Sequence, residues 1–190
     1  MFTLKNVMIA FLFLLSVILS GWSILTIKKH PIPRVKPTVS NQPDAFMEGV
    51  VAVVLNKAGV PALKITSPKM IHYPNNDTTR ILSPHLTVYR NSPEPWLIQS
   101  DYAKAAHGVD EILFWSHVII HHKKDIANLD TTLTTTTLTV FPKKETAETK
   151  AALTVWQPNT TVYAVGMLAN MKAGTIKLLS QTRGVYVPSP

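Results

Sequence analysis

The sequence predicts an all-β domain, built as a barrel, a sandwich or an open roll, behind a single N-terminal transmembrane helix. An uncharged apolar run stands near the N-terminus. From Asp44 onward, Val, Ile and Thr make up 41 of 147 residues, and their β-branched side chains fit a pleated strand. The same region alternates apolar and polar residues with a period of two and shows no sustained period of 3.6, which excludes amphipathic helices as its main element.

The apolar run from Val7 to Ile27 holds 21 residues without a charge. As a helix it would be about 31 Å long, which matches a hydrocarbon core of about 30 Å. A cleaved signal peptide is the alternative, because Lys5 supplies a positive start and Gly21-Trp22-Ser23 resembles a cleavage site. The apolar residues continue past that site, which favours an uncleaved anchor over residues 1–29.

The charges that flank this anchor bear on its orientation in the membrane. Lys5 precedes it, whereas four basic residues follow it within residues 28–36. The positive-inside rule alone would place the C-terminal flank in the cytoplasm. Long C-terminal domains, however, cross membranes largely regardless of charge. The flanking charges therefore do not fix the orientation.

Residues 30–43 read as a linker, because four of these 14 residues are proline and few are apolar. The formal net charge of the chain is +8, and residues 1–44 contain five basic groups and one acidic group. Half of the excess charge thus lies beside the predicted membrane segment, where attraction to headgroups explains it. The remainder is only mildly basic, which argues against binding to nucleic acid.

About nine strands are predicted between residues 44 and 190. Turn residues separate them, such as Asn56-Lys57-Ala58-Gly59, Pro74–Asp77 and His107-Gly108. The predicted strands are 49–55, 62–73, 79–90, 96–105, 111–122, 131–141, 149–156, 160–171 and 175–187.

One parity of each strand is expected to form an inward face, because side chains alternate across a strand. These residues either fill a core or line an apolar groove that holds acyl chains at about 0.8 kcal/mol per buried methylene. The sequence leaves both readings open. The candidates are Leu63, Ile65, Ile71, Tyr73, Leu82, Leu86, Val88, Trp96, Ile98, Ile112, Phe114, Val118, Ile120, Val162, Ala164 and Leu168.

Two further features predict structural or interaction sites. Residues 112–118 and 162–168 share one pattern, with a small residue, Ser116 or Gly166, inside each strand. A small residue there indicates a bulge or a close approach of another strand. The final strand has no strand after it, so its edge could pair with a partner. The candidates for that edge are Ile176, Leu178, Val185 and Tyr186.

The sequence contains no recognisable catalytic motif. The chain has no cysteine, which excludes thiolate ligands and a cysteine nucleophile. It contains no nucleophile elbow, phosphate-cradling glycine loop or HExxH motif. His117, His121 and His122 lie on a predicted strand, where the first two share a face, and solvated histidines are expected there rather than a metal site. No enzymatic activity, cofactor or metal is predicted.

An ordered set of short motifs over nearly the whole chain resembles the LptC family of lipopolysaccharide export. Each motif is weak alone, but their order is specific. The motifs are Gly59, Leu63-x-Ile65-x-Ser67, Ser83-Pro84-x-Leu86, Tyr89, Trp96-x-Ile98-x-Ser100-x-x-Ala103, Phe114-Trp115-Ser116-His117-Val118, Val165-Gly166 and Thr182-Arg183-Gly184-x-Tyr186. Ser116 stands where the family has glycine, and Ser67 and Ser100 stand where it has alanine.

The resemblance implies an all-β, twisted and open antiparallel β-jellyroll over residues 44–190, placed in the periplasm behind one transmembrane helix of the inner membrane. It implies a groove that takes the acyl chains of lipid A. It also implies docking to LptF and LptG, which work with the ATPase LptB, and a C-terminal edge that joins LptA on the way to the outer membrane. A periplasmic scaffold with a closed β domain that binds only protein partners is the alternative.

Overall fold

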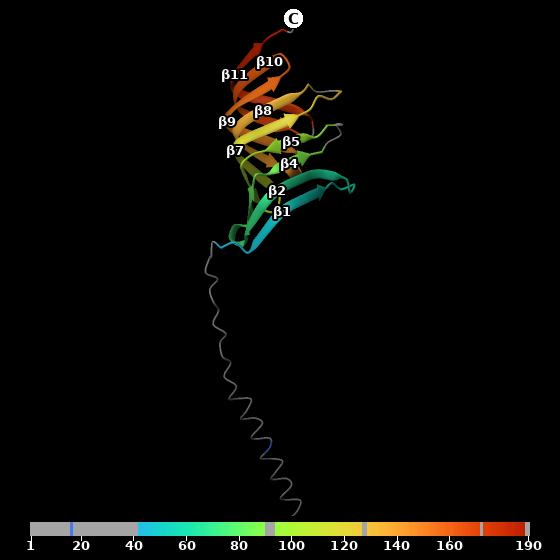
Figure 1. The fold of residues 1–190 in the computed structure, drawn as a ribbon, viewed down its shortest axis with the longest axis vertical. Helices are drawn as coiled ribbons and strands as arrows, with labels where there is room; N and C mark the ends of the chain where they lie inside the picture. Colours follow the sequence, from blue (N-terminus) through green and yellow to red (C-terminus); the bar gives the residue numbers. More distant parts are fainter. Residues whose placement is uncertain (1–15, 17–41, 90–93, 127–128, 172, 189–190) are drawn as a thin grey trace, which may run out of the picture. The chain divides into compact units, whose positions relative to one another are not determined.

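A computed structural model describes residues 16, 42–89, 94–126, 129–171 and 173–188 of the chain. The anchor predicted over residues 1–29, apart from Ser16, and nearly all of the predicted linker lie outside the described residues. Among the residues described, no helix is long and apolar enough to cross a membrane. Residues 39–190 form one compact unit, and its described part is an antiparallel β domain (Figure 1).

Eleven strands and two 3-10 turns make up the β domain. The strands are β1 (Ala45–Leu55), β2 (Pro61–Tyr73), β3 (Thr78–Leu82), β4 (His85–Val88), β5 (Trp96–Gln99), β6 (Tyr102–Ala106), β7 (Glu111–His122), β8 (Thr131–Phe141), β9 (Thr146–Gln157), β10 (Thr160–Asn170) and β11 (Thr175–Tyr186). The turns are η1 (Pro74–Asn76) and η2 (Pro142–Lys144).

Two predicted strands are each broken in the middle. The prediction of continuous strands over 79–90 and 96–105 is wrong, because the structure has β3 and β4 in the first range and β5 and β6 in the second. Pro84 has no N–H for a ladder, and Ser83 adopts a φ of +42°. Ser83 N donates instead to Asp101 O at 2.7 Å, where the second strand breaks. The two breaks therefore face each other across the sheet.

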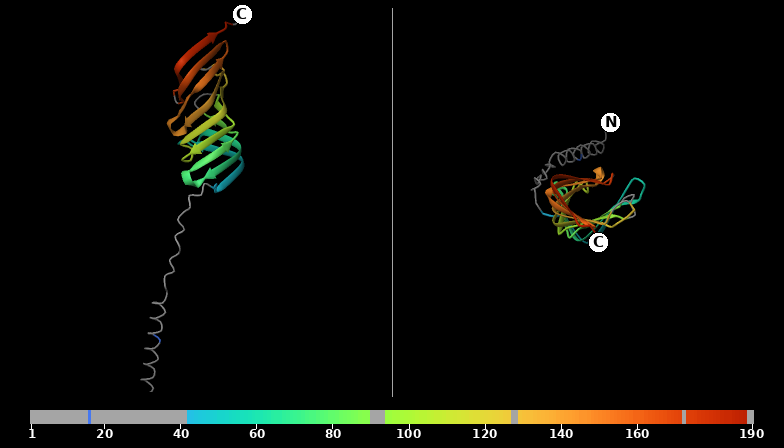
Figure 2. Two further views of the ribbon diagram at one scale, coloured as in Figure 1. Left: turned by 90° about the vertical axis from the view of Figure 1, so that its left-hand side faces the viewer. Right: turned by 90° about the horizontal axis from the view of Figure 1, so that it is seen from above.

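All eleven strands belong to one sheet with two free edges. The order runs β11-β10-β9-β8-β7-β5-β4-β2, and β1 lies on the far side of β2. Between β2 and β7, the sheet contains β4 and β5 at one end of these two long strands and β3 and β6 at the other end. Among the described residues, β1 pairs only with β2, and β11 pairs only with β10. Seen from above, the strands follow an open arc (Figure 2). The sheet is thus an open roll and not a closed barrel.

Every long strand is irregular near its middle, and the irregular positions form a continuous line that we call the crease. Ladder pairing shifts in β7 between Trp115 and Val118, in β8 between Thr135 and Thr139, and in β10 around Gly166. Several crease residues have positive φ, as bulges often do. They are Gly49, Ser83, Ser116, His117, Gly166 and Gln181.

The crease divides the domain into two layers that pack face to face. Layer A contains β3, β6 and the adjoining halves of the long strands, and layer B contains β4, β5 and the other halves. Buried apolar residues from both layers form one core, centred on Phe114, Val118 and Leu138, which are 0% exposed. A cavity of about 50 Å³ between Ile98, Met167 and their neighbours remains. In this structure the facing side chains therefore fill most of the space between the layers.

Candidate functional site

The candidate site is the inner face of the sheet, which consists of apolar rows that run from one free edge to the other. Directly paired residues point to the same side of a sheet, so each register row lies on one face. In layer B one row is Ala52, Ile65, Leu86, Ile98, Ile120, Leu133, Val155, Val162 and Gly184. In layer A one row is Met47, Met70, Ile81, Ala103, Phe114 and Leu138, and it continues with Met167 and Leu178.

Most residues predicted for the inward face lie in or beside these rows. Trp96 and Val162 are half-buried there. The fully buried members are Leu63, Ile65, Leu86, Val88, Ile98, Ile112, Phe114, Val118, Ile120 and Ala164. Their contact with lipid stays a prediction, because the structure contains protein alone.

The other four candidates lie on the outer face, which corrects the assumption of one parity per strand. Ile71 pairs with Arg80, and Leu82, which is 41% exposed, pairs with Tyr102. Tyr73 shares the face of Ile71 on β2, and Leu168 pairs with Lys177 and is 44% exposed. The physical reason is the crease, where the buried residues change parity, from Ser67 to Met70 in β2 and from Ala164 to Met167 in β10.

Because of the crease, a prediction that assumes one parity along each strand also misses other inner-face residues. Met70, Ile81, Ala103, Leu138 and Met167 are at most 5% exposed, yet none was predicted to face inward. The available signal was the small or polar residue in the middle of each strand, such as the Gly166 that directly precedes Met167. A change of parity at these residues in β2, β8 and β10 would have found Met70, Leu138 and Met167, whereas β7 keeps its parity from Phe114 to Val118.

Side-chain hydroxyls satisfy backbone groups that lose their ladder partners at the crease. Ser67 Oγ lies 2.6 Å from Leu82 O and accepts from Lys69 N at 3.1 Å. Ser100 Oγ donates to Tyr102 O at 2.7 Å, and Ser180 Oγ donates to Val165 O at 2.9 Å. Unpaired buried backbone groups are costly, so these hydroxyls stabilise the bend. Ser67 and Ser100, which replace alanines of the family pattern, thus have a specific role.

Asp101, which lies between β5 and β6, binds to β7 at the crease. Its N–H donates to Ser116 O at 3.0 Å, and its Oδ2 accepts from Ser116 Oγ at 2.6 Å. His117 Nδ1 lies 2.6 Å from the same Oδ2. The hydrogen bond from Ser116, followed by the one from His117, holds the pKa of the Asp101 carboxyl below its usual range. Ser116 Oγ also lies 3.4 Å from His117 Nδ1, so Asp101, Ser116 and His117 form one polar cluster at the crease.

The three histidines of β7 differ in environment. His117 is an exposed outer-face residue, and His121 on the same face contacts Thr132 Oγ1 at 3.0 Å. His122 is 0% exposed on the inner face, so the expectation that it is solvated is wrong. Its ring stacks at a tilt on Trp96 with centroids 4.6 Å apart. Within the described ranges no group of three or more His, Cys, Asp or Glu residues could hold a metal ion.

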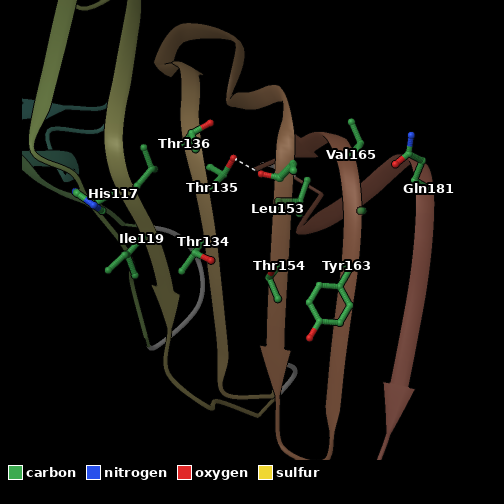
Figure 3. Close-up of a pocket in the computed structure, with 13 residues that line it drawn as sticks. His117, Ile119, Thr134, Thr135, Thr136, Leu153, Thr154, Tyr163, Val165 and Gln181 are labelled. Atoms are coloured by element: carbon green, nitrogen blue, oxygen red, sulfur yellow. Dashed lines mark hydrogen bonds between the residues drawn. The ribbon is translucent and has the colours of Figure 1, made fainter.

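A hollow of about 560 Å³ lies on the outer side of the crease, across β7 to β11 (Figure 3). Threonine hydroxyls of β8 and β9, Tyr163 and Gln181 line it beside His117 and Ile119. Thr135 Oγ1 donates to Ala152 O at 2.9 Å across its floor. This hollow shows where the strands bend apart, and the buried residues Val118, Leu153 and Ala164 also belong to its lining.

The predicted C-terminal edge is a strand of 12 residues, most of them exposed. Ile176 and Leu178 belong to the inner rows, because they pair with Ala169 and Met167. Tyr186 also has the inner parity, whereas Val185 points outward. The apolar rows therefore continue to the unpaired edge.

Ser116 and Gly166 are both crease residues, and Gly59 lies in the turn between β1 and β2 with a φ of +76°. A Cβ at Gly166 would lie 3.0 Å from Leu179 Cδ1 on β11. Among the described glycines, Gly166 is the one at which an added Cβ would contact a neighbouring side chain.

Comparisons with known proteins agree with this geometry. The fold is similar to LptH from Pseudomonas aeruginosa, the LptA-homologous periplasmic component of the lipopolysaccharide transport device, with a TM-score of 0.50 at 9% identity over 67% of this chain and 95% of that chain. No curated protein sequence matches the chain. Residues 13–187 match the family described as lipopolysaccharide-assembly, LptC-related. Because that match covers nearly the whole sequence, the chain belongs to the LptC-related family.

Proposed function

We propose that this protein is a non-enzymatic, lipopolysaccharide-binding adaptor of the transport bridge between the inner and outer membranes. Residues 7–27 anchor it in the inner membrane, and the β domain stands in the periplasm. It receives lipopolysaccharide from the LptB, LptF and LptG transporter and passes it to LptA. Family membership and the LptH-like fold support this role.

The observation that carries the proposal is the continuity of the inner face. Its rows run from β1 to β11, and both edge strands offer unpaired backbone groups. Strands added at either edge would extend the same rows into a neighbouring β domain. An apolar path of this kind suits acyl chains that must cross an aqueous compartment.

Lipid entry requires the two layers to separate. The cavity between them is only about 50 Å³, which is the space of one or two water molecules. The crease is the natural hinge, because its residues already depart from regular strand geometry. Parting the layers exposes apolar side chains, and each acyl methylene that then binds returns about 0.8 kcal/mol.

Site-specific photocrosslinking in cells tests this path with pairs of adjacent residues. Phe114, Val118 and Val162 have the inner parity, and their neighbours Leu113, His117 and Tyr163 have the outer one. We expect lipopolysaccharide adducts at the first three positions and not at the second three. Equal trapping at both parities would remove the basis for an inner-face path.

A scaffold that binds only protein is the second candidate, and the filled core of this structure favours it. Lipopolysaccharide binding by purified, delipidated protein separates the two. Reversible binding supports the adaptor, whereas intact partner binding without lipopolysaccharide binding supports the scaffold.

A further inference from the structure

The outer face of layer A carries a second surface, unrelated to the apolar rows. A hollow of about 620 Å³ lies there across β2, β3, β6 and β7. Three basic residues, Lys69, Arg80 and Lys104, line it together with Tyr102, Trp115 and Leu113. We call these six residues the cationic patch.

The three basic residues of the patch lie close together on the sheet. Arg80 and Lys104 are directly opposite each other on β3 and β6, and Lys69 is diagonal to Arg80. Like charges directly opposite on a sheet destabilise it. Glu48 pairs in register with Lys69 and Glu111 is diagonal to Lys104, but among the described residues none of the three cations forms an ion pair.

Aromatic rings hold two of these cations without neutralising them. Lys69 Nζ lies 5.8 Å from the centre of the Phe46 ring, and the Arg80 guanidinium lies 5.2 Å from that of Tyr73. Tyr102 and Trp115 stack on each other with centroids 5.8 Å apart, and Tyr102 is 45% exposed. Trp115 is half-buried. Cations interleaved with tyrosine and tryptophan are typical of surfaces that lie at a membrane interface.

We propose that the cationic patch docks the β domain on the surface of an anionic phospholipid bilayer. The charge is complementary to headgroup phosphates, and the patch lies on the strands next to β1, where the chain enters the domain. The 14 residues of the predicted linker span at most about 50 Å, which keeps the patch within reach of a bilayer that holds the anchor. The inference rests on the anchoring proposed above and adds a second, electrostatic contact.

Reconstitution of the full chain tests the docking. Since the chain has no cysteine, a single Thr137→Cys beside Trp115 accepts an environment-sensitive fluorophore. The vesicles contain a headgroup nitroxide quencher in either neutral phosphatidylcholine or a mixture with phosphatidylglycerol. We expect quenching only with the anionic lipid, and its loss in 1 M salt, where the screening length falls to about 3 Å.

Matched variants give the test its specificity. Arg80→Gln with Lys104→Gln should lower the docking equilibrium about 25-fold, since each cation contributes about a fivefold preference near an anionic surface. Lys57→Gln with Lys177→Gln removes the same charge elsewhere and should leave quenching intact. The first double variant should melt at the same or a higher temperature than wild type, because it removes a like-charge pair.

Three results would overturn the proposal. Quenching that is equal in neutral and anionic vesicles would show simple tethering. Competition by millimolar inorganic phosphate would show a site for free anions, and quenching unchanged by Arg80→Gln with Lys104→Gln would leave the patch for another occupant such as an acidic protein segment. A chain that does not float with vesicles contradicts the anchor instead, so the two failures are distinguishable.

Discussion

Replacement of Gly166 tests how the crease joins the last two strands. Gly166 has a φ of +79°, which costs a residue with a side chain about 1–2 kcal/mol. A Cβ there would also lie 3.0 Å from Leu179 Cδ1 and 3.2 Å from Leu179 Cβ. Overpacking of this kind costs about 1–3 kcal/mol, so Gly166→Ala should destabilise the domain by about 2–5 kcal/mol in total.

Two other glycines separate the contributions. Gly174 has a φ of +67° with open space around its Cβ position, and Gly184 has neither constraint. At roughly 3 °C per kcal/mol for a domain of this size, Gly166→Ala should lower Tm by about 6–15 °C. Gly174→Ala should lower it by about 3–6 °C, and Gly184→Ala should leave it nearly unchanged.

A double variant isolates the contact itself. Leu179 is 46% exposed, so Leu179→Ala alone should cost little. Combined with Gly166→Ala it should restore Tm to near that of Gly174→Ala, because the crowded side chain is gone. Calorimetric melting measures all five variants. The close approach has no energetic consequence if Gly166→Ala has the same Tm as Gly174→Ala and if adding Leu179→Ala to Gly166→Ala does not raise that Tm.

Gly166→Arg extends the test to function. A long cation at this buried bend must displace Leu179 and with it β11, so we expect weaker LptA association and a larger functional loss than for most substitutions in β10. Growth complementation and co-purification measure it. A variant that folds, binds its partners and supports growth normally would show that glycine is merely tolerated here.

Three further outcomes are expected. Deleting residues 175–190 removes the β11 edge and should abolish co-purification with LptA but not with LptF and LptG; undiminished LptA recovery would place the joining strand elsewhere. Hydrogen bonds to Asp44 and then Asp77 raise the pKa of His72. The contribution of His72 to stability is therefore present below its usual pKa and is lost as pH rises through the raised pKa. NMR titration of His72 should show the raised pKa, and melting of His72→Gln should show the loss of this pH dependence. The Asp101 carboxyl has a lowered pKa, so its contribution to stability is present above its usual pKa and is lost as pH falls through the lowered pKa. Asp101→Asn should therefore reduce the loss of stability at acid pH. If the stability of Asp101→Asn falls at acid pH as it does in wild type, Asp101 has no part in that loss.

Local chemistry in the sequence was enough to place most strands. Alternation of period two and β-branched composition depend only on the pleat, so β2, β7, β8, β10 and β11 appear within a few residues of their predicted bounds. Turn residues did the same for the connections, for example at Gly59, where Asn56 O accepts from the glycine N–H at 3.0 Å. The ordered motifs likewise identified the family from residues alone.

Tertiary structure alone decided which residues face inward beyond the crease. Alternation reports relative orientation within an unbroken strand, but a bulge forms only when a neighbouring strand fixes the register on both sides of it. Ile81 and Met167 are therefore buried, and their neighbours Leu82 and Leu168 are exposed, although all four are equally apolar. The partner of His117 was also invisible in sequence, because Asp101 reaches it across a strand pairing that only the fold creates.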